Sequence, residues 1–412
     1  MSFNPNRIFQ TVTGALMTMA FIAGAQTPAP TTPAPAAPAT PAPAAPDQAA
    51  AAPAAPAAPT WSVGPMDISG FIDGYYSVNF NQPSNAANGQ INQLYNFNDN
   101  TDEFSLSAAK LTLNHDPDPV GAHVDFLYGR TNTDINSGVA TKNGNGDQGN
   151  FIEQAFLSLK PPKAKGFELD FGKFVTSAGA EVIEAKDNWN YSRSLLFVNA
   201  IPYWHFGVRT SMPVSKTETI GFQLVNGWNS VTKDNGGVTG VLTSAYVKPK
   251  YTWNINYLVG PENNNSSYGL RQLIDTTLLL TPPGKFNAYL NYDYGQNRNA
   301  IEDEGNNALV HWQGIAGAFH EQASAKQAFS GRFEYFNDPN GAQTGAVQHL
   351  YEFTATYEYK WVEGLLTRVE YRGDFSNLDS FAKKDIAPFA TGAVDQQQTL
   401  TVAFIAFFGP KR

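Results

Sequence analysis

Cysteine is absent from this 412-residue sequence, and charged residues are scarce, at 15% of the chain. The lack of cysteine excludes disulfide frameworks, thiolate-bound zinc, iron–sulfur clusters and thiol nucleophiles. Acidic residues outnumber basic ones, and the formal net charge is -9. Because a protein needs a basic surface to neutralise phosphates, this balance excludes a nucleic-acid partner.

Long hydrophobic runs are also missing. After residue 25 there is no stretch of about 18 apolar residues, which excludes a membrane protein built from spanning helices. Aromatic residues are nevertheless abundant, with 18 Tyr and 28 Phe, and the mean hydropathy is -0.32. Few charges, many aromatics and no apolar helix together favour a membrane barrel whose strands alternate between a lipid face and a wet face.

The first 60 residues differ from the rest of the chain. Residues 1–25 carry Arg7, an apolar stretch from Ile8 to Ile22 and the small residues Ala23, Gly24 and Ala25, a pattern that predicts a cleaved secretory signal peptide. Residues 26–60 are almost entirely Pro, Ala and Thr, which predicts a disordered linker that serves as a periplasmic spacer. Docking of the linker onto an envelope partner is the alternative. Residues 61–412 form the predicted barrel.

Period-two alternation runs through the remaining chain. In the segment 68–80, Ile72 and Tyr76 share one face, while Asp73 and Ser77 share the other. The same alternation is found in 286–295, 349–361, 365–374 and 400–408. Weaker strand candidates fill the gaps at 104–114, 120–130, 151–160, 166–175, 203–211, 217–228, 240–248, 251–260, 270–280, 309–319 and 327–336. The sequence therefore predicts an all-β fold, a transmembrane antiparallel up-and-down β-barrel.

The connections between these segments alternate in length. Seven are short, such as HDPDP and VEG, and eight are longer and mostly rich in Asn, Gly and Asp. Short turns at one edge and long loops at the other are typical of outer-membrane barrels. The count predicts about 16 strands, within a range of 14 to 18, and an even number places both chain ends in the periplasm. A barrel of this width leaves a water-filled lumen.

The connection from Ser177 to Ala200 mixes apolar and charged residues, unlike the other long connections. A loop that folds into the lumen needs apolar residues against the wall and charged ones toward the water, where opposed charges filter solutes. The candidate constriction residues on it are Glu181, Glu184, Lys186, Asp187 and Arg193. The alternative is an external loop capped by Trp189 and Tyr191.

Charged residues on the wet faces of the strands are further candidates to line the pore. By the alternation these include Lys110 and Asp125, and the candidates retained as pore-lining are Arg209, Arg332, Glu334, Arg368, Glu370 and Arg372. Such residues are also expected in any wide barrel as solvated wall residues paired with their neighbours.

Several motifs carry a resemblance to a known family. They are the run GAEVIEAKDNWNYSRS, the following pattern of Pro202, His205, Gly207 and Arg209, and the segments FIEQAFLSLK and ELDFGKF. From about Ile68 to the C-terminus the chain resembles the β-barrel porins described as OmpL-like. The resemblance implies an outer-membrane barrel with pore activity and says little about the solute. One departure is the end of the chain, FFGPKR, because barrels usually end on an aromatic residue.

These observations predict a porin in the outer membrane of a Gram-negative-type bacterium, in contact with membrane lipid and passing small hydrophilic solutes by passive diffusion. A homotrimer is compatible with a barrel of this size. The six His residues form no HExxH motif and no GxSxG occurs, so no catalytic residue, metal or cofactor is predicted. Two alternatives stay open: a sugar-specific channel with Tyr75, Trp189 and Tyr289 as a stacking track, and a structural or adhesive barrel with an occluded lumen.

Overall fold

The computed structural model of the chain describes residues 62–84, 91–136, 151–233, 235–263, 266–298 and 308–410. The predicted signal peptide and Pro/Ala linker lie outside the described residues. Among the helices of the described residues, none combines the length and the apolar character needed to cross a membrane.

Strands make up most of the described chain. They are β1 (Ser62–Val63), β2 (Met66–Asn79), β3 (Phe104–His115), β4 (Val120–Tyr128), β5 (Ile152–Leu159), β6 (Glu168–Val175), β7 (Trp204–Pro213), β8 (Glu218–Val225), β9 (Thr239–Lys248), β10 (Tyr251–Gly260), β11 (Arg271–Leu280), β12 (Phe286–Arg298), β13 (Leu309–Glu321), β14 (Gln327–Asp338), β15 (Gln348–Val362), β16 (Leu365–Ser376) and β17 (Gln396–Phe408). The helical elements described are α3 (Arg130–Asn136), the 3₁₀ turn η1 (Ala185–Asp187) and α4 (Leu195–Asn199).

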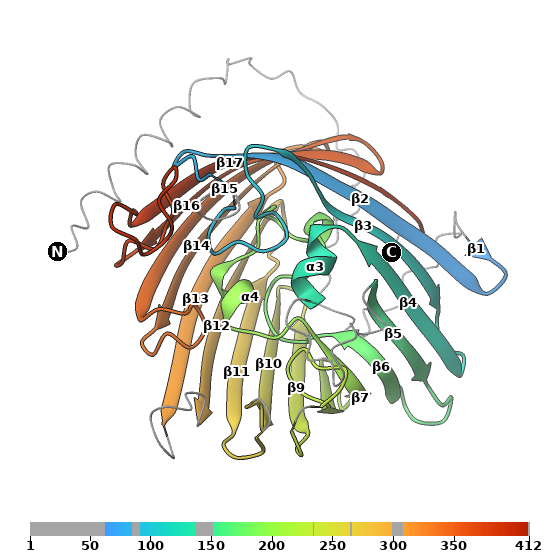
Figure 1. Cartoon of the computed structure of the whole chain (residues 1–412). Helices are drawn as coiled ribbons and strands as arrows, with labels where there is room; N and C mark the ends of the chain where they lie inside the picture. The colour runs from blue at the N-terminus through green and yellow to red at the C-terminus, as the bar shows by residue number, and fades with distance from the viewer. Residues whose placement is uncertain are drawn as a thin grey trace. The chain divides into compact units, whose positions relative to one another are not determined.

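Strands β2 to β17 form a closed antiparallel ring of sixteen strands (Figure 1). Each strand pairs with the next along the chain, and β17 pairs with β2, with Thr399 opposite Asn79 and Phe408 opposite Gly70. The two-residue β1 adds only a short pairing to the beginning of β2. The predicted fold class and the predicted strand number are confirmed.

The strands bury one face and expose the other. On the outer face, Ile72 and Leu290 are 59% and 51% exposed. Their neighbours Asp73 and Asn291 point inward and are almost fully buried. Because successive side chains of a strand point to opposite faces, this alternation gives the ring an apolar outer surface that suits lipid and a polar inner surface.

The connections are short at one edge of the ring and long at the other, as the sequence predicted. The tightest short turns are those between β9 and β10 and between β15 and β16, each of two residues. In the second turn Gly364 has φ +83°, a conformation that favours glycine. At the opposite edge, the connection between β6 and β7 spans residues 176–203 and contains η1 and α4.

The helices α3 and α4 lie within the ring of strands (Figure 1). Leu195, Leu196 and Phe197 of α4 are buried in one apolar cluster with Trp312 of β13 and Phe336 of β14. The apolar core of the molecule therefore lies inside the barrel, between long connections and the inner wall, and not between two sheets.

Candidate functional site

Residues 176–203, called the inserted loop below, reach strands that lie far apart in the ring. The backbone N–H of Ala180 donates to Asn291 Oδ1 of β12 at 3.1 Å. The Asn190 side chain donates to Thr356 Oγ1 of β15 at 2.8 Å. The Tyr191 hydroxyl donates to Asp73 Oδ1 of β2, also at 2.8 Å. The loop therefore folds inward and spans the interior of the barrel, and it is not an external loop.

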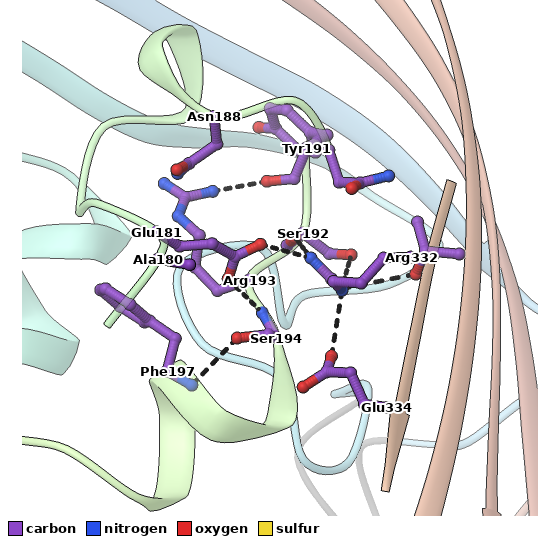
Figure 2. Close-up of polar contacts among 12 residues, drawn as sticks. Ala180, Glu181, Asn188, Tyr191, Ser192, Arg193, Ser194, Phe197, Arg332 and Glu334 are labelled. Carbon is purple, nitrogen blue, oxygen red and sulfur yellow. Dashed lines mark hydrogen bonds and ion pairs between the residues drawn. The ribbon is translucent and has the colours of Figure 1, made fainter. Parts of the chain in front are cut away.

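The centre of this attachment is Arg332 on β14, whose side chain is fully buried (Figure 2). Its Nη1 lies 2.6 Å from Glu181 Oε1 of the inserted loop, and it also donates to the Ser192 carbonyl oxygen at 2.7 Å. Its Nε lies 3.0 Å from Glu334 on the same strand and 3.0 Å from Glu352 on β15. One guanidinium thus joins three carboxylates, of which one belongs to the loop.

Glu334 and Ser194 complete the beginning of α4. The first backbone N–H groups of a helix have no partner within the helix. Glu334 accepts hydrogen bonds from the N–H groups of Leu195 and Leu196 at 3.0 and 3.1 Å. Ser194 accepts one from Phe197 N at 3.0 Å, as an N-cap residue does. A carboxylate of the wall therefore fixes both the position and the direction of the short helix.

Strand β16 binds the backbone of the same loop. Glu370 accepts hydrogen bonds from the N–H groups of Tyr191 and Ser192 at 2.5 and 2.8 Å. Arg368 donates to the carbonyl oxygen of Ala185, and Arg372 donates to that of Arg193. Because these partners are backbone groups, the wall holds the loop in one conformation.

The apolar side of the loop is fitted to the wall as closely as the polar side. A Cβ atom on Gly314 of β13 would lie only 2.7 Å from Leu196 Cδ1, so this glycine allows α4 to approach the strand. A Cβ atom on Gly295 of β12 would overlap the ring of Trp312. The indole of Trp312 in turn donates to the Ala200 carbonyl oxygen at 3.2 Å.

Most of the predicted pore-lining residues are buried by these contacts. Exposed fractions of 6% or less are found for Glu181, Arg193, Arg332, Glu334, Arg368, Glu370 and Arg372. The expectation that they face a water path needs correction, because the inserted loop covers them. Their side chains attach the loop to the wall, or, for Arg193, donate to carbonyl oxygens of the loop itself.

Four predicted residues keep part of their side chains exposed. The exposed fractions are 15% for Glu184, 29% for Lys186, 38% for Asp187 and 16% for Arg209. The first three lie at the η1 turn, and Lys186 pairs with Asp187 at 2.6 Å. Arg209 lies on β7 and pairs with Asp170 on β6 at 2.7 Å. These residues can present charge to a solute, and they stay the candidates for a constriction, called the candidate constriction below.

The structure also places Glu153, which the sequence analysis did not name, among the inward charged residues. Lys110 of β3 and Asp125 of β4 point inward as predicted, and they meet Glu153 of β5 and Glu184 of the loop. The pairing of β4 with β5 shifts register after Asp125, and both Glu153 and Gln154 are buried inside. A β-bulge breaks strict alternation, so a period-two pattern assigns Glu153 to the wrong face.

The connection between β2 and β3 and the helix α3 pack beside the inserted loop. Asp134 of α3 accepts a hydrogen bond from Phe97 N at 2.8 Å, and Arg130 pairs with Asp99 at 2.6 Å. The indole of Trp204 donates to the Ile135 carbonyl oxygen at 2.9 Å. Burial, with a smaller contribution from nearby Asp99, raises the pKa of Asp134 to about 6. Three long connections therefore contribute to the packed interior.

The aromatic residues proposed for a sugar track lie in two places. Trp189 packs on Tyr289 with ring centroids 5.2 Å apart, and it stacks on His320 at 5.6 Å. Tyr75 instead packs on Tyr191 at 5.8 Å. The three rings are therefore packed against other aromatic rings, in pairs that help to seat the inserted loop.

Comparison with known proteins agrees with this architecture. The model of the family described as "Putative beta-barrel porin-2, OmpL-like" matches residues 65–408. No curated protein matches the chain.

Several solved structures share the fold. The trimer form of in-vitro folded OmpT, an outer-membrane protein of Vibrio cholerae, is 11% identical with a TM-score of 0.52, covering 83% of this chain and 99% of its own. The outer-membrane channel DcaP of Acinetobacter baumannii is also 11% identical, with a TM-score of 0.52 and coverages of 83% and 97%. Salmonella typhi OmpF, in complex with daunomycin, is 13% identical, with a TM-score of 0.51 and coverages of 83% and 97%. At these identities the likeness shows a shared fold.

Proposed function

The chain belongs to the OmpL-like family of β-barrel porins, and from this membership we propose that it is a passive channel whose lumen is narrowed by the inserted loop. It is an outer-membrane porin. Its proposed solutes are small and hydrophilic. The solutes would pass the candidate constriction formed by Glu184, Lys186 and Asp187 on the loop and Arg209 on the wall. We propose a channel and not an enzyme, and membership of a porin family supports this.

One observation carries the proposal: the inserted loop is held across the lumen through buried charges, while its η1 turn keeps charged side chains exposed. A pore needs both kinds of charge, because the charges that filter solutes must be held in place while ions and water flow past them. The buried pairs around Arg332 supply the fixation. The exposed carboxylate of Asp187, with the less exposed Glu184 beside it, supplies charge at the narrow part, where low-dielectric walls strengthen the field.

Single-channel conductance of the full-length chain, refolded in detergent and inserted into a planar bilayer, tests this function. We expect ohmic conductance and a preference for cations in a salt gradient. The double variant Glu184→Gln and Asp187→Asn is expected to lower the cation preference, while the control Glu363→Gln, in an exposed turn, leaves it unchanged. A correctly folded chain without conductance would refute the channel function.

A silent barrel is the second candidate, and the deep burial of the inner wall favours it. If no conductance is found, a structural or adhesive barrel with an occluded lumen takes the place of the porin. A sugar-specific channel predicts instead that added sugars block an existing current. The same recordings therefore distinguish all three functions.

The surroundings of the barrel are also part of the proposal. The outer membrane is its location, and the linker of residues 26–60 is proposed to extend into the periplasm. We further propose a homotrimer, the state named for the OmpT structure of Vibrio cholerae. Analytical ultracentrifugation in detergent tests the trimer, and a monomeric mass in mild detergent contradicts it.

A further inference from the structure

Four charged side chains meet where the tip of the inserted loop reaches the wall. They are Lys110 of β3, Asp125 of β4, Glu153 of β5 and Glu184 of the loop, called the tricarboxylate cluster below. Lys110 Nζ lies 2.9 Å from Asp125 Oδ2 and 2.6 Å from Glu153 Oε2, and it also contacts Glu184. Three carboxylates therefore surround one ammonium group.

With its three carboxylates ionised, the cluster carries more negative charge than Lys110 neutralises. Asp125 and Glu153 are 1% and 0% exposed, and Glu184 is only 15% exposed at its side chain. His123 Nε2 lies 3.0 Å from Asp125 and adds a positive charge only when it is protonated. Burying an unpaired charge is costly, so a site of this kind favours a further cation.

Glu153 supplies independent evidence for a missing ligand. Its side chain is fully buried, and Oε1 accepts no hydrogen bond from any residue that the structure describes. A buried carboxylate oxygen without a partner is rare in folded proteins. Because one oxygen of Glu153 lies within 4.8 Å of oxygens of Asp125 and Glu184, the carboxylate that carries the unused oxygen belongs to the group that would surround a bound cation.

The geometry fits a divalent cation of the calcium class. One oxygen from each of Asp125, Glu153 and Glu184 lies within 4.8 Å of the other two. Calcium binds carboxylate oxygens at about 2.3–2.6 Å, so a single ion can contact all three. The charges also balance, because three carboxylates, one ammonium group and one divalent cation sum to zero.

We propose that the tricarboxylate cluster binds a calcium-class divalent cation, and that this ion ties the inserted loop to the wall beside the water path. Lys110 leaves the centre of the cluster when the ion binds, which its flexible four-carbon stem permits. The proposal rests on the proposed function only for its effect on current. Because Glu184 belongs to the loop and the other ligands to the wall, bound calcium stabilises the loop and lowers the monovalent cation current.

Equilibrium dialysis of the full-length chain with radioactive calcium tests the site without reference to transport. In zwitterionic detergent we expect one site with a Kd of about 10⁻⁴ to 10⁻³ M, the range of weak oxygen-ligand sites. Magnesium should compete at least tenfold more weakly, because it demands a smaller and more regular set of ligands. Glu153→Gln is expected to lower the affinity at least tenfold, and Lys110→Gln to raise it about tenfold.

Two controls keep this test decisive. Glu363→Gln removes an exposed carboxylate from a turn and leaves calcium binding unchanged. Glu184→Gln removes the partly exposed ligand, and it replaces Glu153→Gln in the test if Glu153→Gln fails to fold. Folding is judged by the heat-dependent mobility of the barrel on gels. Absence of binding in the parent chain overturns the proposal, and so does binding that appears only after Lys110→Gln.

The effect on transport is measured in bilayers of zwitterionic lipid, which do not themselves concentrate calcium. At millimolar calcium and constant ionic strength we expect the potassium current of the parent chain to fall at least twofold, and that of Glu153→Gln to stay unchanged. A channel that conducts without any response to calcium contradicts this inference and leaves the porin function intact. A folded chain that binds calcium without conducting contradicts the porin function and leaves the site intact.

Discussion

Replacing Arg332 with methionine is expected to release the inserted loop from the wall and leave the strand ring closed. The guanidinium lies within 3.0 Å of Glu181, Glu334 and Glu352 and is fully buried. Removing one member of a buried ion pair costs about 3–5 kcal/mol, because the partner charge stays buried without compensation. Here three carboxylates lose the same cation, so a loss of at least about 3 kcal/mol is expected.

This loss falls mainly on the attachment of the loop. The backbone of Arg332 keeps its ladder positions opposite Ala318 and Thr354, so the strand pairing on both sides of β14 is unaffected. A loss of about 3–5 kcal/mol shifts the ratio of attached to detached loop by a factor of roughly 10² to 4 × 10³. Detachment of the loop widens the lumen.

Single-channel conductance and limited proteolysis of the full-length chain measure this effect. We expect the Arg332→Met variant to conduct more and to be cleaved within residues 176–203, with barrel stability in detergent unchanged. Lys160→Met is the control, because its ion pair with Glu168 is exposed and such pairs contribute little. If Arg332→Met keeps both the conductance and the protease resistance of the parent chain, the buried charges do not hold the loop.

Two further predictions concern the packing of the interior. The first is Gly314→Val, which places a side chain against Leu196, where even a Cβ atom would lie 2.7 Å from Leu196 Cδ1. This overlap should weaken the docking of α4 by about 1–3 kcal/mol and raise the conductance. Asp134 has a pKa raised by burial to about 6, so its contribution to stability is full below about pH 3.8 and is lost as the pH rises through 6. Hydrogen exchange of residues 91–103 should therefore report packing that is weaker at pH 8 than at pH 5, by about 1.4 kcal/mol, and Asp134→Asn should remove this difference.

Each of these predictions has a contrary result. Unchanged conductance of Gly314→Val, in a chain with the parent's barrel stability, shows that α4 does not depend on close approach to β13. For Asp134, equal pH dependence in the parent and in Asp134→Asn, after correction for intrinsic exchange rates, shows that another group is responsible.

The strand ring could be predicted from the sequence because each strand has a lipid face and an inner face along its whole length. Leu290 and Asn291 illustrate this, since the adjacent residues are 51% and 4% exposed. The lengths of the turns and loops also predicted the number of strands and the edge of the ring at which each connection lies. The alternation and the connection lengths are both local features of the sequence, so they can be recognised without knowledge of the tertiary contacts.

The role of the inner charges could not be predicted in the same way. Alternation assigns Arg332 to the inner face, but the contact that covers it comes from Glu181, which is 151 positions away in the chain. Whether an inward side chain meets water or a folded loop depends on such distant contacts. Glu153 was missed for a different reason, because the bulge between β4 and β5 shifts its face.

The central claim is that this barrel is a water-filled channel narrowed by the inserted loop. Its most direct test is the single-channel conductance of the full-length chain beside a variant in which residues 179–200 are replaced by a short Gly/Ser linker, which the adjacent positions of Val175 and Trp204 allow. The account predicts a small ohmic conductance for the parent and one several-fold larger for the variant. Equal conductance, or none in either folded barrel, would contradict it.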